Sequence, residues 1–113
     1  MSNITPIFQL NKQIFTDGDM SDDLTSEILD LGEVSGYAVH YIWTGSPAGN
    51  LIVSGSNTEN LNDFVVVDTH AAGGAAGKYM FNLPISHYRY VLVQFVNTSG
   101  SGVLNCYVSG KRG

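Results

Sequence analysis

The sequence predicts an all-β fold, an eight-stranded antiparallel β-sandwich that is jelly-roll-like. Short runs rich in β-branched and aromatic residues recur at intervals of roughly ten residues along the chain. Gly, Asn, Ser and Pro separate these runs, and 13 of the 113 residues are glycine. Apolar residues at helical spacing are hard to find, with one weak window over residues 20–31.

The runs read as eight strands in chain order, each bounded by turn-forming residues. They cover residues 10–15, 26–31, 37–44, 50–56, 64–68, 78–83, 88–97 and 103–110. The strands belong to one domain over residues 10–113, and residues 1–9 precede it as an N-terminal arm. A free arm and a docked arm both fit the sequence.

Glycine-containing segments are predicted to connect the strands. Residues 45–49 place Pro47 between two permissive glycines, which favours a hairpin between adjacent strands. Residues 98–102 favour a second hairpin between the last two strands. The alanines and glycines of residues 69–77 bury too little surface to order themselves, so we expect a mobile loop there or one ordered by a partner.

Alternation along the strands predicts which side chains face the core. The predicted core faces carry Tyr37, Val39, Tyr41 and Trp43 in one strand and Leu104, Cys106 and Val108 in the last. Cys106 is the single cysteine, so no internal disulfide forms and we expect a buried thiol.

The strand over residues 88–97 is apolar on both faces and therefore needs cover on both sides. This cover could come from the arm or from another subunit, and we expect a homo-oligomer, a trimer or a dimer. The candidate partner-binding residues are Ile7, Phe8, Tyr88, Tyr90 and Leu92.

Composition excludes several classes of partner. Five Lys and Arg stand against ten Asp and Glu, a net charge of −5, so the chain lacks the basic surface that nucleic acid binding requires. No apolar run approaches the ~18 residues needed to cross a bilayer. The first 30 residues contain no basic segment followed by an apolar one, so we expect no secretory signal. Neither nucleic acid nor membrane is an expected partner.

No motif predicts catalysis, a metal site or a cofactor. Asp17, Asp19 and Ser21 have the alternate spacing of a calcium loop, but Asp22 and Ile28 stand where Gly and the bidentate Glu are expected. A solvated turn fits better. The three histidines have no partner at zinc-ligand spacing. We expect a protein that is not an enzyme, although a carboxylate pair for glycoside hydrolysis depends only on separation in space and stays open.

Aromatic residues gather near Pro84, and exposed rings bind sugars or anchor protein interfaces. Burial in the sandwich core is the alternative for these rings. The cluster consists of Tyr79, Phe81, His87, Tyr88 and Tyr90.

Two stretches of the sequence carry a resemblance to a known family. The first is VHYIWTG at residues 39–45, which continues through GNLIVSGSN at residues 49–57, and the second comprises YRYVLV at residues 88–93 and SGSGVLN at residues 99–105. Both stretches resemble small virion accessory proteins of tailed bacteriophages, and the second resembles the last hairpin of those proteins. Where the family has Asn-Asp followed by Trp, this chain has Asn57 and Thr58, followed later by Phe64.

The resemblance implies a jelly-roll-like sandwich that works as a homo-oligomer on the virion. It implies a capsid decoration (cement) protein, made in the host bacterial cytoplasm, which binds the major capsid protein shell at the capsid surface. The alternatives are a head fibre, tail or baseplate accessory protein, or a carbohydrate-binding β-sandwich module. Three aromatics forming an accessible platform would favour the carbohydrate-binding module.

Overall fold

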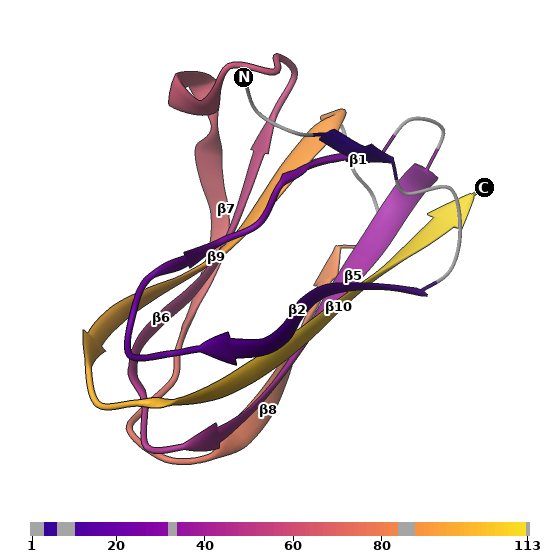
Figure 1. The fold of residues 1–113 in the computed structure, drawn as a ribbon. Coiled ribbons are helices and arrows are strands. Elements are labelled where there is room, and N and C mark those ends of the chain that lie inside the picture. The colour runs from indigo at the N-terminus through magenta and orange to yellow at the C-terminus, as the bar shows by residue number, and fades with distance from the viewer. Residues whose placement is uncertain (1–3, 7–10, 32–33, 84–87, 113) are drawn as a thin grey trace.

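The structure is a computed structural model that describes residues 4–6, 11–31, 34–83 and 88–112. Strands dominate these residues, and a single short 3-10 helix interrupts them (Figure 1). Within the described ranges, no helix has the length and hydrophobicity that a membrane span requires. The elements are β1 Ile4–Pro6, β2 Asn11–Asp19, β3 Leu24–Thr25, β4 Ile28–Asp30, β5 Val34–Gly45, β6 Ala48–Ser56, η1 Leu61–Asp63, β7 Val65–Ala71, β8 Gly77–Leu83, β9 Tyr90–Ser99 and β10 Gly102–Arg112.

Two sheets form the sandwich that the sequence predicts. One has the order β1-β4-β9-β6-β7, with β3 also paired to β9, and the other has the order β2-β10-β5-β8. The pair β1 and β4 is parallel, and the other strand pairs that the structure describes are antiparallel. From β4 onward the chain changes sheet at each connection except that between β6 and β7, which is the jelly-roll arrangement.

The strand predicted over residues 26–31 is shorter in the structure, where Ser26 lies between β4, Ile28–Asp30, and a separate two-residue strand outside the predicted range, β3, Leu24–Thr25. The backbone N–H of Ser26 donates to the Val93 carbonyl at 2.9 Å. The N–H of Val93 donates in return to the Ser26 hydroxyl, also at 2.9 Å. This hydroxyl takes the place that a backbone carbonyl has in a regular ladder. Residues 24–30 therefore form two short strands, β3 and β4, and not one continuous strand.

The prediction that residues 45–49 and 98–102 close hairpins is wrong. β5 pairs with β8 and β10, whereas β6 pairs with β7 and β9, so both turns carry the chain from one sheet to the other. The turns lie against each other, and the N–H of Ser46 donates to the Ser101 carbonyl at 2.9 Å. Gly100 has a φ of 75°, and a Cβ there would collide with the Ser46 carbonyl oxygen. Glycine at this position therefore permits close approach of two crossing turns.

The predicted core faces are confirmed. Alternate side chains of β5 and β10 are buried between the sheets: Tyr37, Val39, Tyr41, Trp43, Leu104, Cys106 and Val108. The Tyr41 hydroxyl donates to the carbonyls of Ile52 and Gln94, each at 3.3 Å, and so links its own sheet to the opposite one. Ile42, which follows Tyr41 in the strand, lies on the exposed outer face.

The connection between β7 and β8 is held by groups of the chain itself, which its small residues did not indicate. The N–H of Ala72 donates to the Gly49 carbonyl at 2.9 Å. The indole Nε1 of Trp43 donates to the Ala75 carbonyl at 2.7 Å. Hydrogen bonds within the chain therefore anchor the segment expected to be mobile or ordered by a partner, although its residues 73–76 are exposed.

Candidate functional site

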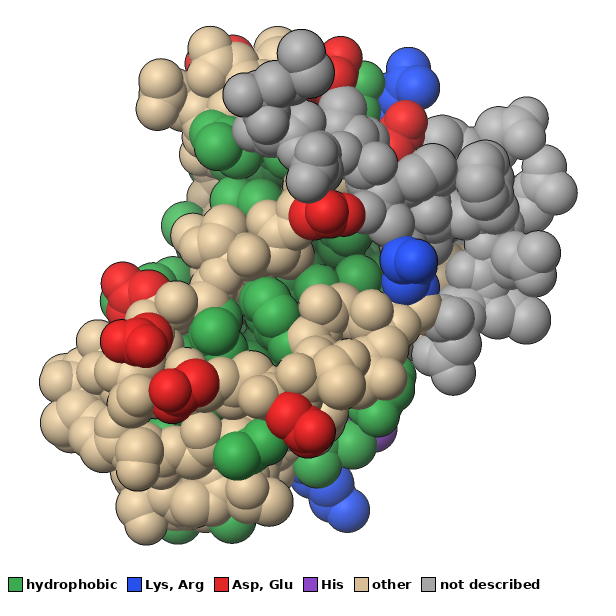
Figure 2. Space-filling view, viewed as in Figure 1, with side chains coloured by type: hydrophobic (Ala, Val, Ile, Leu, Met, Phe, Trp, Pro, Cys, Tyr) green, Lys and Arg blue, Asp and Glu red, His purple; other side chains and the backbone are tan. Residues whose placement is uncertain are grey.

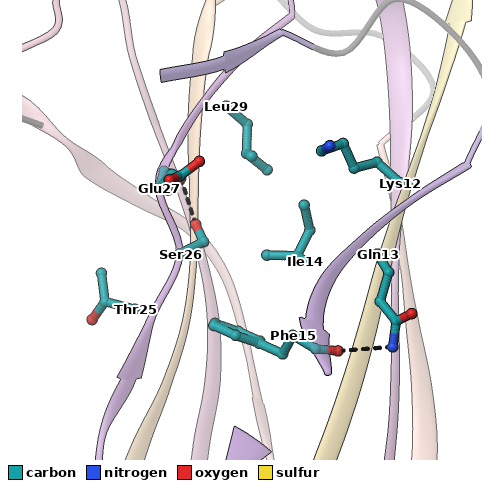
Figure 3. A pocket seen from close by; sticks show the side chains of 8 residues that line it. All are labelled: Lys12, Gln13, Ile14, Phe15, Thr25, Ser26, Glu27 and Leu29. Carbon is teal, nitrogen blue, oxygen red and sulfur yellow. Dashed lines mark hydrogen bonds between the residues drawn. The ribbon is translucent and has the colours of Figure 1, made fainter. Parts of the chain in front are cut away.

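An open cleft lies between the two sheets where β2 faces β3 and β4 (Figure 3). β2 is the edge strand of its sheet. In the opposite wall, β3 pairs only with β9 among the described strands, whereas β4 lies between β1 and β9. The cleft has a volume of about 320 Å³. Its lining consists of Lys12, Gln13, Ile14, Phe15, Thr25, Ser26, Glu27 and Leu29.

The floor of the cleft is apolar. Leu29 is fully buried, while Ile14 and Phe15 are half-buried and pack against the main core. Figure 3 shows Ile14 and Leu29 pointing toward each other across the space. The walls meet at one end, because a Cβ at Gly18 would lie 2.9 Å from Leu24 Cδ1.

The surface around the closed end of the cleft, called the rim below, is acidic, although the lining of the cleft itself contains one acidic residue, Glu27, and one basic residue, Lys12. Residues 12–27 contain five of the ten acidic residues of the chain and a single basic residue, Lys12. The five carboxylates are exposed, and Figure 2 shows acidic side chains around the hydrophobic ones on this side of the molecule. They belong to Asp17, Asp19, Asp22, Asp23 and Glu27.

These carboxylates support turns and do not converge on one point. The hydroxyl and the N–H of Ser21 donate to Asp19 Oδ1 at 2.7 and 2.9 Å, and these hydrogen bonds hold the pKa of Asp19 below its ordinary value. The N–H of Asn97 donates to Asp23 Oδ1 at 2.8 Å. Among the described residues, no three His, Cys, Asp or Glu side chains are grouped so that they could hold a metal ion.

A second apolar surface lies on β7, the edge strand on the other side of the sheet that contains β9. Val65 and Val66 are 69% and 58% exposed, and Val67 and Leu61 of η1 are also exposed. In the described structure β7 pairs with β6 alone, so the backbone groups along its outer edge are not used in strand pairing there. These four residues, called the valine edge below, form a surface of the kind that contacts proteins.

A second hollow, of about 430 Å³, lies on the outer face of β5, β8 and β10. The rings of His40 and Tyr107 lie there, with centroids 6.2 Å apart. Ile42 and Met80 are exposed beside them. The hollow therefore combines two rings with an aliphatic surface.

The aromatic rings do not form a platform of three accessible side chains in the part of the chain that the structure describes. Each Phe, Tyr and Trp side chain there is buried or half-buried. In the cluster near Pro84, Tyr79 stacks on His70 with ring centroids 3.6 Å apart, and Phe81 is in the core. The described surface thus exposes aliphatic side chains, which suit protein contact, more than aromatic rings, which suit the stacking of sugars.

The predicted partner-binding residues fall in different places. Ile7, Phe8 and the clustered His87 lie outside the described residues. Tyr90 and Leu92 are 8% and 6% exposed, in a cluster with Ile28 against which Phe64 packs.

Tyr88 is half-buried, and its hydroxyl lies 2.6 Å from that of Tyr37. From the expected arm, residues 4–6 form β1 and pair with residues 28–30. β1 extends the sheet and does not cover the outer face of β9, whereas Phe64 of the same chain packs against Tyr90 and Leu92, so part of the cover that this strand needs comes from within the chain. Partner contact through the five residues stays a prediction.

The sequence did not single out the cleft or the valine edge. Ile14, Phe15 and Leu29 belong to predicted strands, and nothing local shows that two sheet edges separate at these positions. The signals available were the acidic cluster, interpreted as a solvated turn, and the three successive valines at residues 65–67 without polar alternation.

The strand order defines the class of fold, a jelly-roll β-sandwich. No family model and no curated protein sequence matches the chain. Among solved structures, the PBSX exported protein XepA has a TM-score of 0.71 at 18% identity over 92% of this chain, which spans 37% of the length of XepA.

Two further solved structures share the fold across nearly their whole length. The SPBc2 prophage-derived protein YomS has a TM-score of 0.53 at 12% identity, covering 94% of this chain and 98% of its own. Chitosan-binding module 1 of a chitosanase/glucanase from Paenibacillus sp. IK-5 has a TM-score of 0.50 at 15% identity, covering 92% of this chain and 96% of its own. At these identities the likeness shows the fold.

Proposed function

We propose that the protein is a bacteriophage accessory structural protein, and specifically a capsid decoration (cement) protein that binds and stabilises the major capsid protein shell. The observation that carries the proposal is the valine edge, an exposed aliphatic strand with an unpaired side. The prophage origin named for YomS and the resemblance of residues 39–57 to virion proteins support a phage context.

The proposed role needs binding and no reaction. Covering aliphatic side chains with a protein surface lowers the free energy and so favours binding. Sugar binding instead uses exposed aromatic rings on which the sugar stacks. A protein that bridges several shell subunits multiplies modest contacts through effective concentration. We propose that it acts at the capsid surface as a trimer or dimer and is not an enzyme.

Binding to purified shells that lack the protein tests this role. Protein added to such shells should sediment with them and should appear on their surface by electron microscopy. Val66→Lys should lower the apparent affinity for the shell by about tenfold or more, because a charge would be buried at the contact. Met80→Lys places the same charge on the exposed outer face of the other sheet and should leave binding unchanged.

Two outcomes would reject the capsid assignment. Density on the tail, head fibre or baseplate of complete virions, with bare shells, would favour the other virion roles. Absence of the protein from every part of the particle would reject a virion role altogether.

A carbohydrate-binding module is the second candidate, favoured by the hollow that contains Tyr107 and His40. The shared fold of the chitosan-binding module is compatible with it. Retention on a chitosan column that is lost in Tyr107→Ala, together with no binding to phage particles, would place this function ahead of the capsid one.

A further inference from the structure

We infer that the cleft between β2 and β3–β4 is a docking site for an extended basic and apolar peptide segment of another protein, which adds a strand to the edge of β2. This inference is independent of the capsid proposal, which uses the valine edge on the opposite side of the molecule. It is carried by the free sheet edge, the apolar floor and the charge of the rim.

The edge of β2 is long enough to receive a strand. β2 contains nine residues, and among the described strands it pairs with β10 alone, along one side. An extended peptide can satisfy the backbone groups along the other side, and such main-chain hydrogen bonds supply much of the affinity in strand addition. The opposite wall contains the two-residue β3 and the three-residue β4, so β2 is the longer template.

The inner face of β2 determines where side chains of an added strand would lie. Lys12 and Phe15 pair with Val108 and Cys106, which are fully buried between the sheets. A strand added beside β2 continues this inner face, so every second side chain enters the cleft above Leu29. Those side chains must be apolar, because the floor that they would cover is apolar.

The acidic rim favours basic side chains at the positions of the added strand that do not enter the cleft. The ion pair that the structure records among the described residues joins Arg89 to Asp30, so Asp17, Asp19, Asp22 and Asp23 take no part in it. In Figure 3, Lys12 and Phe15 lie at opposite ends of the cleft. After Phe15, β2 continues toward these aspartates. Lys or Arg side chains of the occupant would therefore lie toward the closed end.

The same charge argues against other occupants. A second copy would bring its own acidic rim against this one, and like charges brought together cost binding free energy. Nucleic acid would be repelled by the carboxylates. A basic, apolar strand from a different protein complements both the floor and the rim.

A short peptide provides the test. The probe is a terminally blocked, fluorescein-labelled octapeptide of alternating Lys and Val, compared with the matching Glu and Val peptide by fluorescence anisotropy. The Lys peptide should bind about tenfold or more tightly than the Glu peptide, and the difference should shrink at high salt. Hydrogen exchange of the complex should slow at the amides of residues 11–17. Alternate N-methylation of the peptide should abolish binding, because it removes donors that strand pairing requires.

Two matched isoleucine variants test whether the peptide binds in the cleft. Ile14→Lys places a like charge on the cleft floor and should weaken peptide binding by about tenfold or more. Ile42→Lys introduces the same change on the exposed outer face of the same sheet and should leave binding unchanged. Far-ultraviolet circular dichroism and urea unfolding verify that both variants fold, and Glu27→Gln offers a milder change at the rim should Ile14→Lys not fold.

Four results of the peptide experiments would overturn the inference. The two peptides could bind with equal affinity, or neither could bind. The peptide could slow hydrogen exchange outside β2 and not within it, or both the Ile14→Lys and the Glu27→Gln variants could bind the peptide as tightly as the unchanged protein. Concentration-dependent self-association that Ile14→Lys abolishes would also overturn it, because the occupant would then be a second copy of this chain.

Discussion

The imidazole of His70 on β7 stacks on the phenol ring of Tyr79 on β8, with centroids 3.6 Å apart and planes 10° from parallel. The two strands are edge strands of different sheets. The stacked pair therefore joins the sheets on the side opposite the cleft, and the sandwich is closed by rings on one side and open on the other.

The His70–Tyr79 contact should stabilise the domain beyond the burial of each ring. A double-mutant cycle with His70→Ala and Tyr79→Ala should give a coupling free energy of about 0.5–1.5 kcal/mol, as aromatic pairs do. Urea unfolding of the four proteins measures it. A coupling indistinguishable from zero would mean that the stacking adds nothing to stability.

Trp43 should contribute through both its volume and its hydrogen bond to Ala75. Trp43→Ala should lower the free energy of unfolding by about 3–5 kcal/mol, because it leaves a large cavity. Trp43→Phe should lower the free energy of unfolding by less. It should nevertheless speed hydrogen exchange at the backbone amides of residues 72–76. Unchanged exchange there in Trp43→Phe would show that the indole does not hold this segment.

Cys106 should be inert in the folded protein. It is fully buried, and burial raises the pKa of its thiol, so the reactive thiolate is not populated. Labelling by a thiol reagent should be slow in buffer and should accelerate through the urea transition. Rapid stoichiometric labelling of the native protein would contradict the assigned strand faces.

Stability should fall at alkaline pH. Burial raises the pKa values of Tyr37 and Tyr41 above the ordinary 10.0, with the Tyr88 hydroxyl adding to the effect on Tyr37. The unfolded chain ionises these phenols near their ordinary pKa while the folded chain does not, so the stabilisation is complete below that pH and declines above it. Urea unfolding at about pH 8 and about pH 11 measures the loss. Tyr41→Phe should make the dependence shallower, and an equal slope in this variant would contradict the assignment.

Removing residues 1–9 should leave the sandwich folded and should weaken oligomerisation or attachment to the capsid. The deletion removes β1, which pairs with β4, and therefore exposes a sheet edge. Sedimentation and shell-binding assays compare the two lengths. If both proteins are monomeric and decorate shells with the same occupancy, the arm has no role in assembly.

Local alternation made much of the fold predictable. The positions of Tyr41, Trp43 and Cys106 in the core follow from a period of two along the chain, which depends only on neighbouring residues. Composition likewise predicted a β-sandwich, since glycine-rich turns and β-branched runs leave no long helical segment.

Tertiary structure decided which strands pair and where the sandwich is open. The turn at residues 45–49 looks like a hairpin connection in sequence, yet its outcome depends on β10 and β9, which lie about fifty residues further along the chain and occupy the places beside β5 and β6. The division at Ser26 depends on Val93 in the same way. Strand pairing and the cleft arise from hydrogen bonds and packing between distant segments, and a pattern read along one strand contains no information about its neighbours in space.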